Sequence, residues 1–297
     1  MPVRLLLAAL ALALAGPAAP PPPVPADPPL WVVRDADTTI YLFGSVHWLK
    51  PDIGWFDDEV RRAFDAADTL VLETPPVEAA EAQRTQDAIG KTASGPTLPD
   101  RLPAAYRPKL AAALAELGYP AGAFDRVKPW LAATTLSILP LKRRGYDAGA
   151  GVEAVLTAAA RRSDKPILGL EPRVQQLGYF DALPDAAQMA MLTRQLDNMD
   201  KTGDSTDAVL AAWTKGDAAA LGRIVDADQR ASSAAFGKAI LSDRNRRWAA
   251  WIARRLEQPG TMFMAVGVGH LTGSDTVQRA LSERGLAARR IRPGASR

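Results

Sequence analysis

Hydrophobic residues along this chain follow two alternating patterns. Short apolar runs rich in β-branched and aromatic residues are separated by long stretches rich in Ala and Leu. The short runs predict β-strands and the long stretches predict helices. The predicted strands are residues 30–33, 39–46, 69–72, 166–170, 262–268 and 287–291. A turn at Asp35-Ala36-Asp37 would join the first two strands as a hairpin.

Predicted helices fill the gaps between these strands and contain most of the chain. They are residues 56–67, 78–90, 103–117, 128–140, 150–162, 184–199, 205–228, 234–257 and 275–284. Most of them fall into two blocks, about 75–165 and 175–258, and neither block contains a convincing strand. The alternation predicts a single α/β domain over residues 30–293, with a mixed β-sheet core and large helical insertions.

The N-terminal residues have the pattern of a secretory signal peptide. Arg4 is followed by an unbroken run of Leu and Ala that ends at Ala15, much shorter than the ~20 residues that span a bilayer. We therefore expect residues 1–15 to be a cleaved signal peptide, and a second small-x-small site would place the cleavage after Ala26. Residues 16–29 are mostly Pro and Ala, which predicts an extended tether.

The overall composition narrows the class of protein. Hydrophobic residues make up 47% of the 297 residues and charged residues 23%, as in ordinary globular domains. The net charge of +3 is too small to indicate a nucleic-acid partner. Because the chain has no cysteine, neither a disulfide nor a thioether lipid anchor can form. We expect a periplasmic or secreted protein with no membrane span after cleavage.

The only two histidines of the chain lie in matching Gly-x-x-His motifs. Gly44 precedes His47 and Gly267 precedes His270, and each motif ends a strand-like run. With 22 glycines in 297 residues, the chance that a given histidine has glycine three positions before it is roughly 7%. The chance that both histidines have it by accident is about half a percent. Glycine at these places permits a close approach of the backbone where a strand gives way to a loop.

Two further strand-like runs end on a carboxylate, at Glu73 and at Glu171. Parallel strands of an α/β sheet bring their carboxyl ends to one edge, where such folds bind ligands. We therefore expect His47, His270 and the two glutamates at one edge of the sheet. Imidazole and carboxylate groups together suit a divalent ion such as Mn, Co or Zn, with an open position for water.

Simpler interpretations of the same residues stay open. One of the carboxylates could be a general base beside a metal that the other residues hold. A lone histidine at a strand end is more often a hydrogen-bonded structural residue than a ligand. Glu73 could simply mark the exit of its strand into solvent, and Glu171, before Pro172, could end a strand or cap the next helix.

Arg244 gives an independent indication of a buried polar site. In the predicted helix 234–257, Phe236, Ile240, Trp248 and Ile252 form an apolar stripe, and Arg244 falls in its gap. A buried guanidinium must meet a carboxylate or bind an anionic group of a substrate, because burying it unpaired costs several kcal/mol. The alternative is that Arg244 extends to solvent beside its neighbouring arginines.

A serine nucleophile is not expected. Ser45 lies inside the first motif but not in a Gly-x-Ser-x-Gly turn, and with two histidines in the chain none is left as a dedicated base.

Taken together, five motifs in this order resemble the TraB/GumN family. They are Tyr41-Leu42-Phe43-Gly44-Ser45-Val46-His47, Leu72-Glu73, Gly169-Leu170-Glu171, Arg244-Asn245 and Val266-Gly267-Val268-Gly269-His270-Leu271. The resemblance runs from about Tyr41 to Ile291. The family is similar to the Tiki-type membrane metalloproteases and more distantly to erythromycin esterase-like (EreA) and ChaN-like proteins, although this chain lacks the transmembrane segment of the membrane members.

The resemblance implies an EreA/ChaN-like α/β fold with a histidine- or metal-dependent site. Carried over by motif, His47, Glu73, Glu171, Arg244 and His270 become the expected active site, and all but Arg244 are expected ligands of a possible divalent ion (Mn, Co or Zn). We therefore expect an exported, metal-dependent hydrolase that cleaves a peptide or another amide or ester bond. The main alternative is a periplasmic binding protein that sequesters a peptide, a metal or haem, and a third is a non-catalytic structural factor of the cell envelope.

Overall fold

The structure, a computed structural model, describes residues 23–291. The predicted signal peptide, residues 1–15, and the predicted tether up to residue 22 lie outside the described residues. In the part of the chain that is described, no helix is long and apolar enough to cross a membrane.

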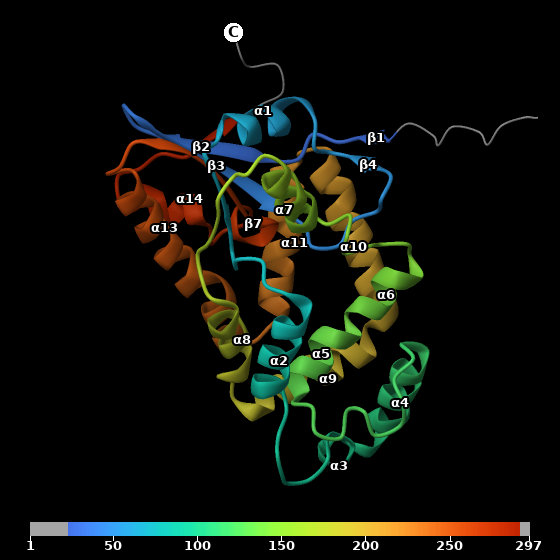
Figure 1. The fold of residues 1–297 in the computed structure, drawn as a ribbon. Coiled ribbons are helices and arrows are strands. Elements are labelled where there is room, and N and C mark those ends of the chain that lie inside the picture. The colour runs from blue at the N-terminus through green and yellow to red at the C-terminus, as the bar shows by residue number, and fades with distance from the viewer. Residues whose placement is uncertain (1–22, 292–297) are drawn as a thin grey trace, which may run out of the picture.

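A six-stranded sheet forms the centre of the fold, in the order β6-β5-β7-β3-β2-β8 (Figure 1). The strands are β2 (Leu30–Arg34), β3 (Thr38–Ser45), β5 (Thr69–Leu72), β6 (Ile167–Gly169), β7 (Gly260–Gly267) and β8 (Arg289–Ile291). The four strands β6, β5, β7 and β3 are parallel, and β2 is antiparallel to both of its neighbours. Each of the six predicted strands is present, and the expected mixed α/β fold is confirmed.

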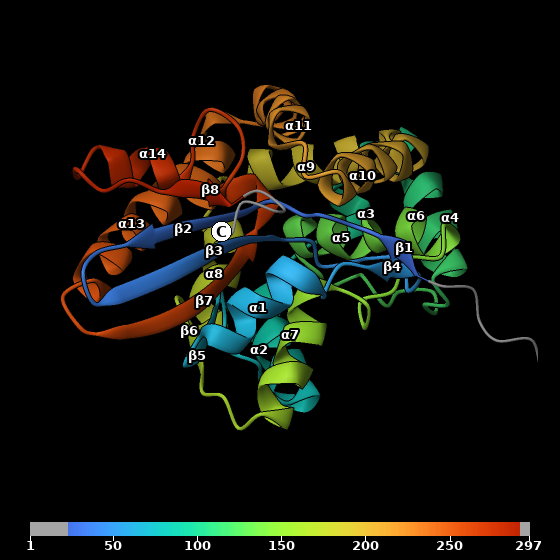
Figure 2. The ribbon, with the colours of Figure 1, turned by 90° about the horizontal axis from the view of Figure 1, so that it is seen from above.

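Both faces of the central strands of this sheet are buried. Along β7, Phe263 and Ala265 belong to one hydrophobic cluster, whereas Met264 and Val266 belong to the cluster on the other face. Helices α1 and α7 cover the first face and α13 and α14 the second (Figure 2). A strand that is buried on both sides needs apolar residues at every position, which explains why β7 is a continuous apolar run rather than an alternating one.

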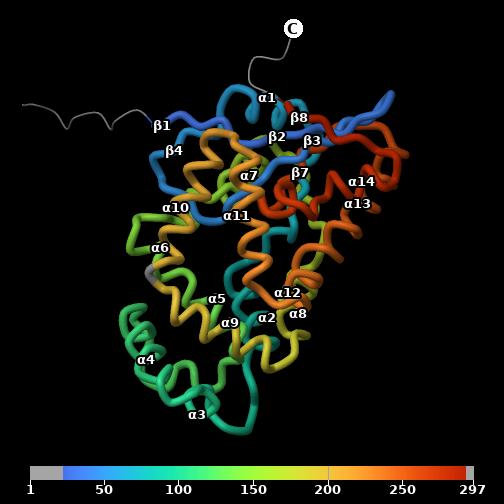
Figure 3. Tube along the Cα trace, turned by 180° about the vertical axis from the view of Figure 1, so that it is seen from behind, coloured from blue at the N-terminus to red at the C-terminus, as the bar shows by residue number. Residues whose placement is uncertain are grey.

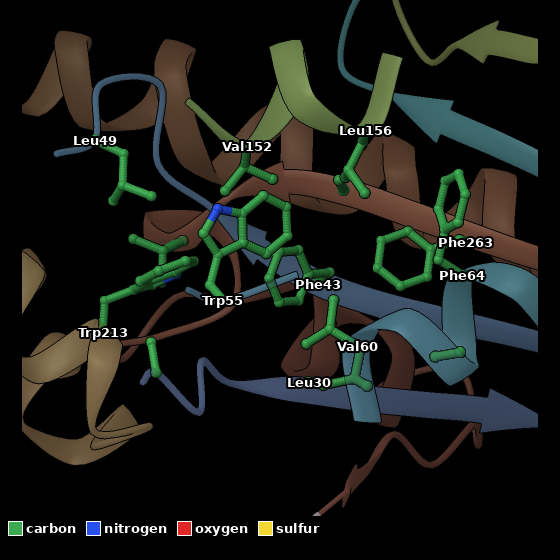
Figure 4. Close-up of a cluster of buried hydrophobic side chains, with 14 of the residues drawn as sticks. Leu30, Phe43, Leu49, Trp55, Val60, Phe64, Val152, Leu156, Trp213 and Phe263 are labelled. Atoms are coloured by element: carbon green, nitrogen blue, oxygen red, sulfur yellow. The ribbon is translucent and has the colours of Figure 1, made fainter. Parts of the chain in front are cut away.

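Aromatic side chains pack around the end of β3 (Figure 4). The rings of Phe43 and Trp55 stack with centroids 5.5 Å apart, and Trp213 meets Phe43 edge-on at 6.1 Å. The indole N–H of Trp213 donates a hydrogen bond of 2.7 Å to the carbonyl oxygen of Gly44. This contact fixes the backbone of the first Gly-x-x-His motif against the helical part of the molecule.

Helices form the rest of the domain. They are α1 (Asp58–Ala66), α2 (Ala79–Gly90), α3 (Leu98–Arg101), α4 (Arg107–Glu116), α5 (Pro129–Leu136), α6 (Ile138–Arg143), α7 (Val152–Arg162), α8 (Arg173–Asp181), α9 (Asp185–Asp197), α10 (Met199–Thr214), α11 (Ala218–Ala231), α12 (Ala234–Gly237), α13 (Asp243–Arg255) and α14 (Val277–Ser282). Helices α2 to α7 lie between β5 and β6, and α8 to α13 lie between β6 and β7, in the two blocks where the sequence predicts insertions.

Part of the inserted helices forms a second hydrophobic core away from the sheet. Helices α3, α4, α5 and α9 contribute to it, with Leu98, Leu110, Trp130, Leu136 and Leu192 among its buried side chains. In the front and back views these helices extend from the sheet toward the far end of the molecule (Figures 1 and 3).

The two longest predicted helices are each interrupted in the structure. The predicted helix 205–228 is divided into α10 and α11 because Gly216 has φ +61°, which a helix cannot continue through. The side chain of Asp217 then accepts a hydrogen bond of 2.8 Å from the Ala220 N–H and caps α11. The predicted helix 234–257 contains a π-helical turn, Lys238–Ser242, between α12 and α13.

The described end of the predicted tether packs on the domain instead of running free. Strand β1 (Val24–Pro25) pairs in parallel with β4 (Ile53–Gly54), and the Asp27 N–H donates to the Thr214 carbonyl at 2.8 Å. Ala26 is buried. These contacts hold this segment against β4 and against the C-terminal end of α10.

The N-terminus of α7 lies directly against the first histidine. The Val152 N–H donates a hydrogen bond of 3.1 Å to the Val46 carbonyl. A Cβ atom on Gly151 would fall inside van der Waals distance of the His47 carbonyl oxygen. The approach of α7 to the end of β3 therefore requires glycine at position 151.

We expect Gly151→Ala to lower the free energy of unfolding by about 1–3 kcal/mol, because the added methyl forces α7 away from β3. Denaturant unfolding followed by circular dichroism measures this loss. Gly178→Ala in α8 is the matched control, since its Cβ would meet no atom within 4 Å. Gly178→Ala should leave stability unchanged or raise it, because alanine favours the helix, and the explanation is wrong if Gly151→Ala unfolds at the same denaturant concentration as the wild type.

Candidate functional site

A buried arginine is the centre of the site. Arg244, on the first turn of α13, is 4% exposed. Its Nη2 donates to Oε2 of Glu73 at 2.5 Å, and its Nε donates to Oε2 of Glu171 at 3.0 Å. Its Nη1 lies 3.1 Å from Nε2 of His270. A buried arginine requires a carboxylate partner, and Arg244 has two.

These contacts determine the proton position on His270. A guanidinium only donates, so Nε2 of His270 must be the acceptor and carries no proton. Nδ1 then carries the proton and donates to Oδ1 of Asn245 at 2.7 Å. The amide nitrogen of Asn245 donates in turn to the carbonyl oxygen of Asp275 at 2.9 Å, which agrees with this orientation.

Every carboxylate oxygen of the buried cluster has a donor. Oε1 of Glu73 accepts from the Gly267 N–H at 2.7 Å, and Oε2 accepts from Gln176 at 2.8 Å as well as from the arginine. Oε1 of Glu171 accepts from the Tyr179 hydroxyl at 3.1 Å. A buried charge network is stable only when its members are all satisfied, and this one is.

The sheet topology explains why these residues meet. Glu73 follows β5, Glu171 follows β6, and His270 ends the short 3-10 helix (Val268–His270) that follows β7. The three strands are neighbours and parallel, so their carboxyl ends lie at one edge. Arg244 reaches this edge from α13, directly after the π-helical turn, a helix distortion that often accompanies functional sites.

His47, at the end of β3, is in a different environment. Its side chain is 66% exposed, and its Nδ1 lies 3.0 Å from Oε1 of Glu153. Glu153 is in the first turn of α7, where the helix dipole favours a negative charge. The Ser45 hydroxyl donates to the same carboxylate oxygen at 2.5 Å. Ser45 is therefore bound to the glutamate and not to the imidazole.

Electrostatics keeps the exposed pair charged. The negative charge of Glu153 raises the pKa of His47 to about 9, against the opposing effect of its partial burial. Burial on its own raises the pKa of Glu153, but the attraction of His47 and the hydrogen bonds from His47 and Ser45 bring it below its ordinary value. At neutral pH the pair is an imidazolium beside a carboxylate.

The histidine of the buried cluster, His270, is neutral. Burial, together with the positive charge of Arg244, lowers the pKa of His270 to about 3, so this imidazole is neutral. Burial opposes ionisation of Glu73, but the basic groups around it and the Gly267 N–H more than offset this and lower its pKa to about 2. At neutral pH His47 is therefore positively charged and His270 is neutral, although both lie at the same edge of the sheet.

The structure brings together four of the five predicted residues, namely Glu73, Glu171, Arg244 and His270, and leaves His47 outside their hydrogen-bond network. Sequence reasoning did not include Glu153, the direct partner of His47. A glutamate in the first turn of a helix has an ordinary explanation in the helix dipole, so nothing in the sequence singled it out. Its role depends on the docking of α7, which the Gly149-Ala-Gly151 segment before the helix permits.

The predicted divalent ion does not fit the cluster in this arrangement. The three nitrogen positions of Arg244 occupy the space that faces Glu73, Glu171 and Nε2 of His270, and an ion there would meet a positive guanidinium. Within residues 23–291, no three His, Asp or Glu side chains are placed to share an ion. A metal would need Arg244 to be displaced first, and binding of Mn, Co or Zn stays a prediction.

The fold and the site define a mixed α/β domain with an arginine-centred ionic cluster at the carboxyl edge of its parallel strands. Residues 29–290 match the model of the TraB/PrgY/gumN family, and the chain belongs to this family.

Three relatives are similar over most of their length. One is an uncharacterized protein of Treponema pallidum (strain Nichols), 23% identical over 274 residues, which cover 86% of this chain and 80% of the relative. Another is the uncharacterized protein YbaP of Escherichia coli K12, 21% identical over 254 residues, with 86% and 92% covered. YbaP of Shigella flexneri is 22% identical over 241 residues, with 81% and 87% covered. No solved structure matches the chain.

We expect Arg244→Met to lower the free energy of unfolding at pH 7 by about 3–5 kcal/mol, because two buried carboxylates lose their cation. Arg246→Met, an exposed arginine of the same helix, should change it by less than about 0.5 kcal/mol. Chemical unfolding from pH 7 to pH 4 measures both. In the wild type the folded pKa of Glu73 lies below its ordinary value, so its stabilising contribution is present above about 4.5 and is lost as the pH falls toward 2.

In the Arg244→Met variant that contribution is missing and the unpaired carboxylates take up protons, so the stability difference from the wild type should shrink as the pH falls. A deficit that is small, or that grows on acidification, would contradict the charge network described above.

The two imidazoles can be followed separately by NMR of histidine-labelled protein. We expect one signal, from His47, to titrate near pH 9 and the other, from His270, to stay neutral with its proton on Nδ1 until the pH approaches 3. Glu153→Gln should move the first titration toward 6.5, the ordinary value, and leave the second unchanged. Titration of His270 between pH 5 and 8 would show that the described cluster is wrong.

Proposed function

We propose that this protein is a hydrolase of peptide or other amide or ester bonds, in which His47 is the residue that meets the substrate. The observation that carries the proposal is the position of this side chain. Among the five residues expected at the site, His47 alone is exposed, and Glu153 holds it by Nδ1 at the carboxyl edge of the parallel strands. The other four are buried.

The His47–Glu153 pair has the geometry of an acid–base group. A carboxylate on one imidazole nitrogen fixes the orientation of the ring and leaves the other nitrogen for the reacting atoms. Nε2 of His47 has no hydrogen-bond partner among the residues that the structure describes. Because Ser45 donates to Glu153 rather than to the imidazole, water is the nucleophile in this proposal.

The proposed reaction balances without a covalent intermediate. The water oxygen forms a bond to the carbonyl carbon, and the C–N or C–O bond of the substrate breaks. The proton on Nε2 of His47 goes to the leaving nitrogen or oxygen, and a proton from the attacking water restores the imidazolium. This role agrees with a histidine that holds its proton at neutral pH.

In this proposal the buried cluster positions the pair. Glu73, held by Arg244, accepts the hydrogen bond of the Gly267 N–H. Gly267 is the register partner of Ser45 where β7 lies beside β3, and the Ser45 side chain in turn contacts Glu153. A chain of direct contacts thus connects the arginine with the support of His47. Glu73, Glu171, Arg244 and His270 are positioning residues here rather than residues that touch the substrate.

A binding protein remains the second candidate. The observation that favours it is that four of the five expected residues are buried and hydrogen-bonded to one another, which is also what a rigid frame around a ligand site requires. Its ligand would be a peptide, a metal or haem, retained at one equivalent and not converted. The assay described next separates the two, because it records product as well as retention.

We expect His47→Ala to lower the rate of hydrolysis by 10² to 10⁴-fold, the usual contribution of an acid–base group, while the protein stays folded. The measurement is turnover of a panel of fluorogenic peptides and esters, with and without a chelator and with added Mn²⁺. Wild-type activity should decline as the pH rises through about 9, and Glu153→Gln should shift this decline to lower pH. Glu59→Gln, which removes a partly buried carboxylate that pairs with Arg62 on α1, is the control.

Full activity in the His47→Ala variant would rule out the proposed role of His47. Retention of a panel compound by the wild type without any product would favour the binding protein. Activity that depends on Mn²⁺ would restore the metal-dependent hydrolase that the sequence predicts.

A further inference from the structure

A pocket lies next to the buried cluster and is lined in part by Glu171. Its volume is about 250 Å³. Side chains from α13, from the segment that joins β6 to α8 and from α8 form its walls, chiefly Glu171, Gln175, Arg247, Trp248, Trp251 and Arg254. The hydrolase proposal does not use this pocket.

Helical spacing explains how α13 forms one wall. Arg247, Trp251 and Arg254 are four and three residues apart, so they lie on one face of the helix. Two guanidinium groups therefore flank one indole ring along the same wall. Gln175, from the first half of α8, adds an amide on the other side of the pocket.

The charge at this pocket is positive. Arg254 is exposed and has no ion pair among residues 23–291. Arg247 donates to the Tyr179 hydroxyl at 2.8 Å and lies 3.5 Å from Oε1 of Glu171. Glu171 already accepts from Arg244, so it neutralises neither neighbour fully. The charged residues that line the pocket are thus two arginines and one carboxylate, and one positive charge is left in excess.

The buried part of the same wall is an indole ring. Trp248 is 2% exposed, and it lies beside Arg247 on α13. Two cations beside indole rings make this surface suited to a ligand that brings acceptor oxygens, negative charge and an apolar group.

We propose that this pocket binds a ligand through its carboxylate, together with an apolar group of about the size of one amino-acid side chain. Arginine presents a planar fork that matches the two oxygens of a carboxylate. The indole of Trp251 offers an apolar wall beside it. A volume of about 250 Å³ is below the range of typical small-molecule sites, so the bound group is small.

The C-terminal residue of a peptide and a free small acid both carry this chemistry. Binding of a carboxylate at this pocket does not depend on the proposed hydrolase function. Only the assignment of that carboxylate to the substrate rests on it. In that case the pocket would anchor the end of the peptide beside the Glu171–Arg244 pair, and the enzyme would prefer substrates with a free C-terminal carboxylate over their amides.

The test is a direct binding measurement, so that it does not depend on turnover. Tryptophan fluorescence and calorimetry follow the titration of N-acetyl-alanyl-phenylalanine and 3-phenylpropionate, each against its own amide, into the wild type and into the His47→Ala variant. We expect at least one acid to bind about 10-fold or more tightly than its amide in both proteins. Tighter binding of the peptide acid identifies a peptide end as the ligand, and binding of 3-phenylpropionate alone identifies a small acid.

Arg254→Met should remove most of the preference for the acid, because this arginine has no structural partner to lose. Arg246→Met is the matched control on another face of the same helix, and it should keep the preference. The proposal is overturned if acid and amide bind equally, if Arg254→Met has no effect, or if inorganic phosphate binds as tightly as the carboxylic acids. Failure of the hydrolase proposal would appear instead as absent turnover with the acid preference intact.

Discussion

A guanidinium buried among the ends of three strands imposes the central constraint on this structure. Arg244 cannot lose its charge in a protein, and burial removes most of its water. Glu73 and Glu171 must therefore follow β5 and β6 at the same edge of the sheet, within reach of the guanidinium, and His270 must turn an unprotonated nitrogen toward it. The positions of three strands, one helix and one histidine tautomer all follow from the need to satisfy this one side chain.

The position of Arg244 also determines, through backbone contacts, where the exposed His47 lies. Glu73 uses one oxygen for Arg244 and the other for the Gly267 N–H, which places the end of β7. Since β7 pairs with β3, the end of β3 is placed too, and with it the exposed imidazole of His47. The cluster and the His47–Glu153 pair are thus two layers of one site: a neutral histidine and paired charges inside, and a protonated histidine at the surface.

The sequence was most informative where a residue conflicted with its surroundings. Arg244 interrupts an apolar stripe, and the cost of burying a charge predicts a carboxylate or an anionic substrate group beside it, although not which residues supply the carboxylates. The central strands β3, β5 and β7 were predictable because strands buried on both faces need nearly unbroken apolar runs. Glu153 was not predictable, because its contact with His47 depends on how α7 docks. The break at Gly216 was readable in principle, since Lys215-Gly216-Asp217 combines a helix-ending glycine with a capping aspartate.

The strand order has a consequence for the order in which the chain can become functional. β7 lies between β3 and β5, yet it begins at residue 260, close to the C-terminal end of the described chain. Until β7 is made, β3 and β5 have no common neighbour and the sheet is in two pieces. Arg244 likewise emerges from the ribosome well after both of its glutamate partners. A growing or truncated chain that stops before β7 therefore has neither the complete sheet nor His270, so the complete ionic centre can form only after residue 270 has been made.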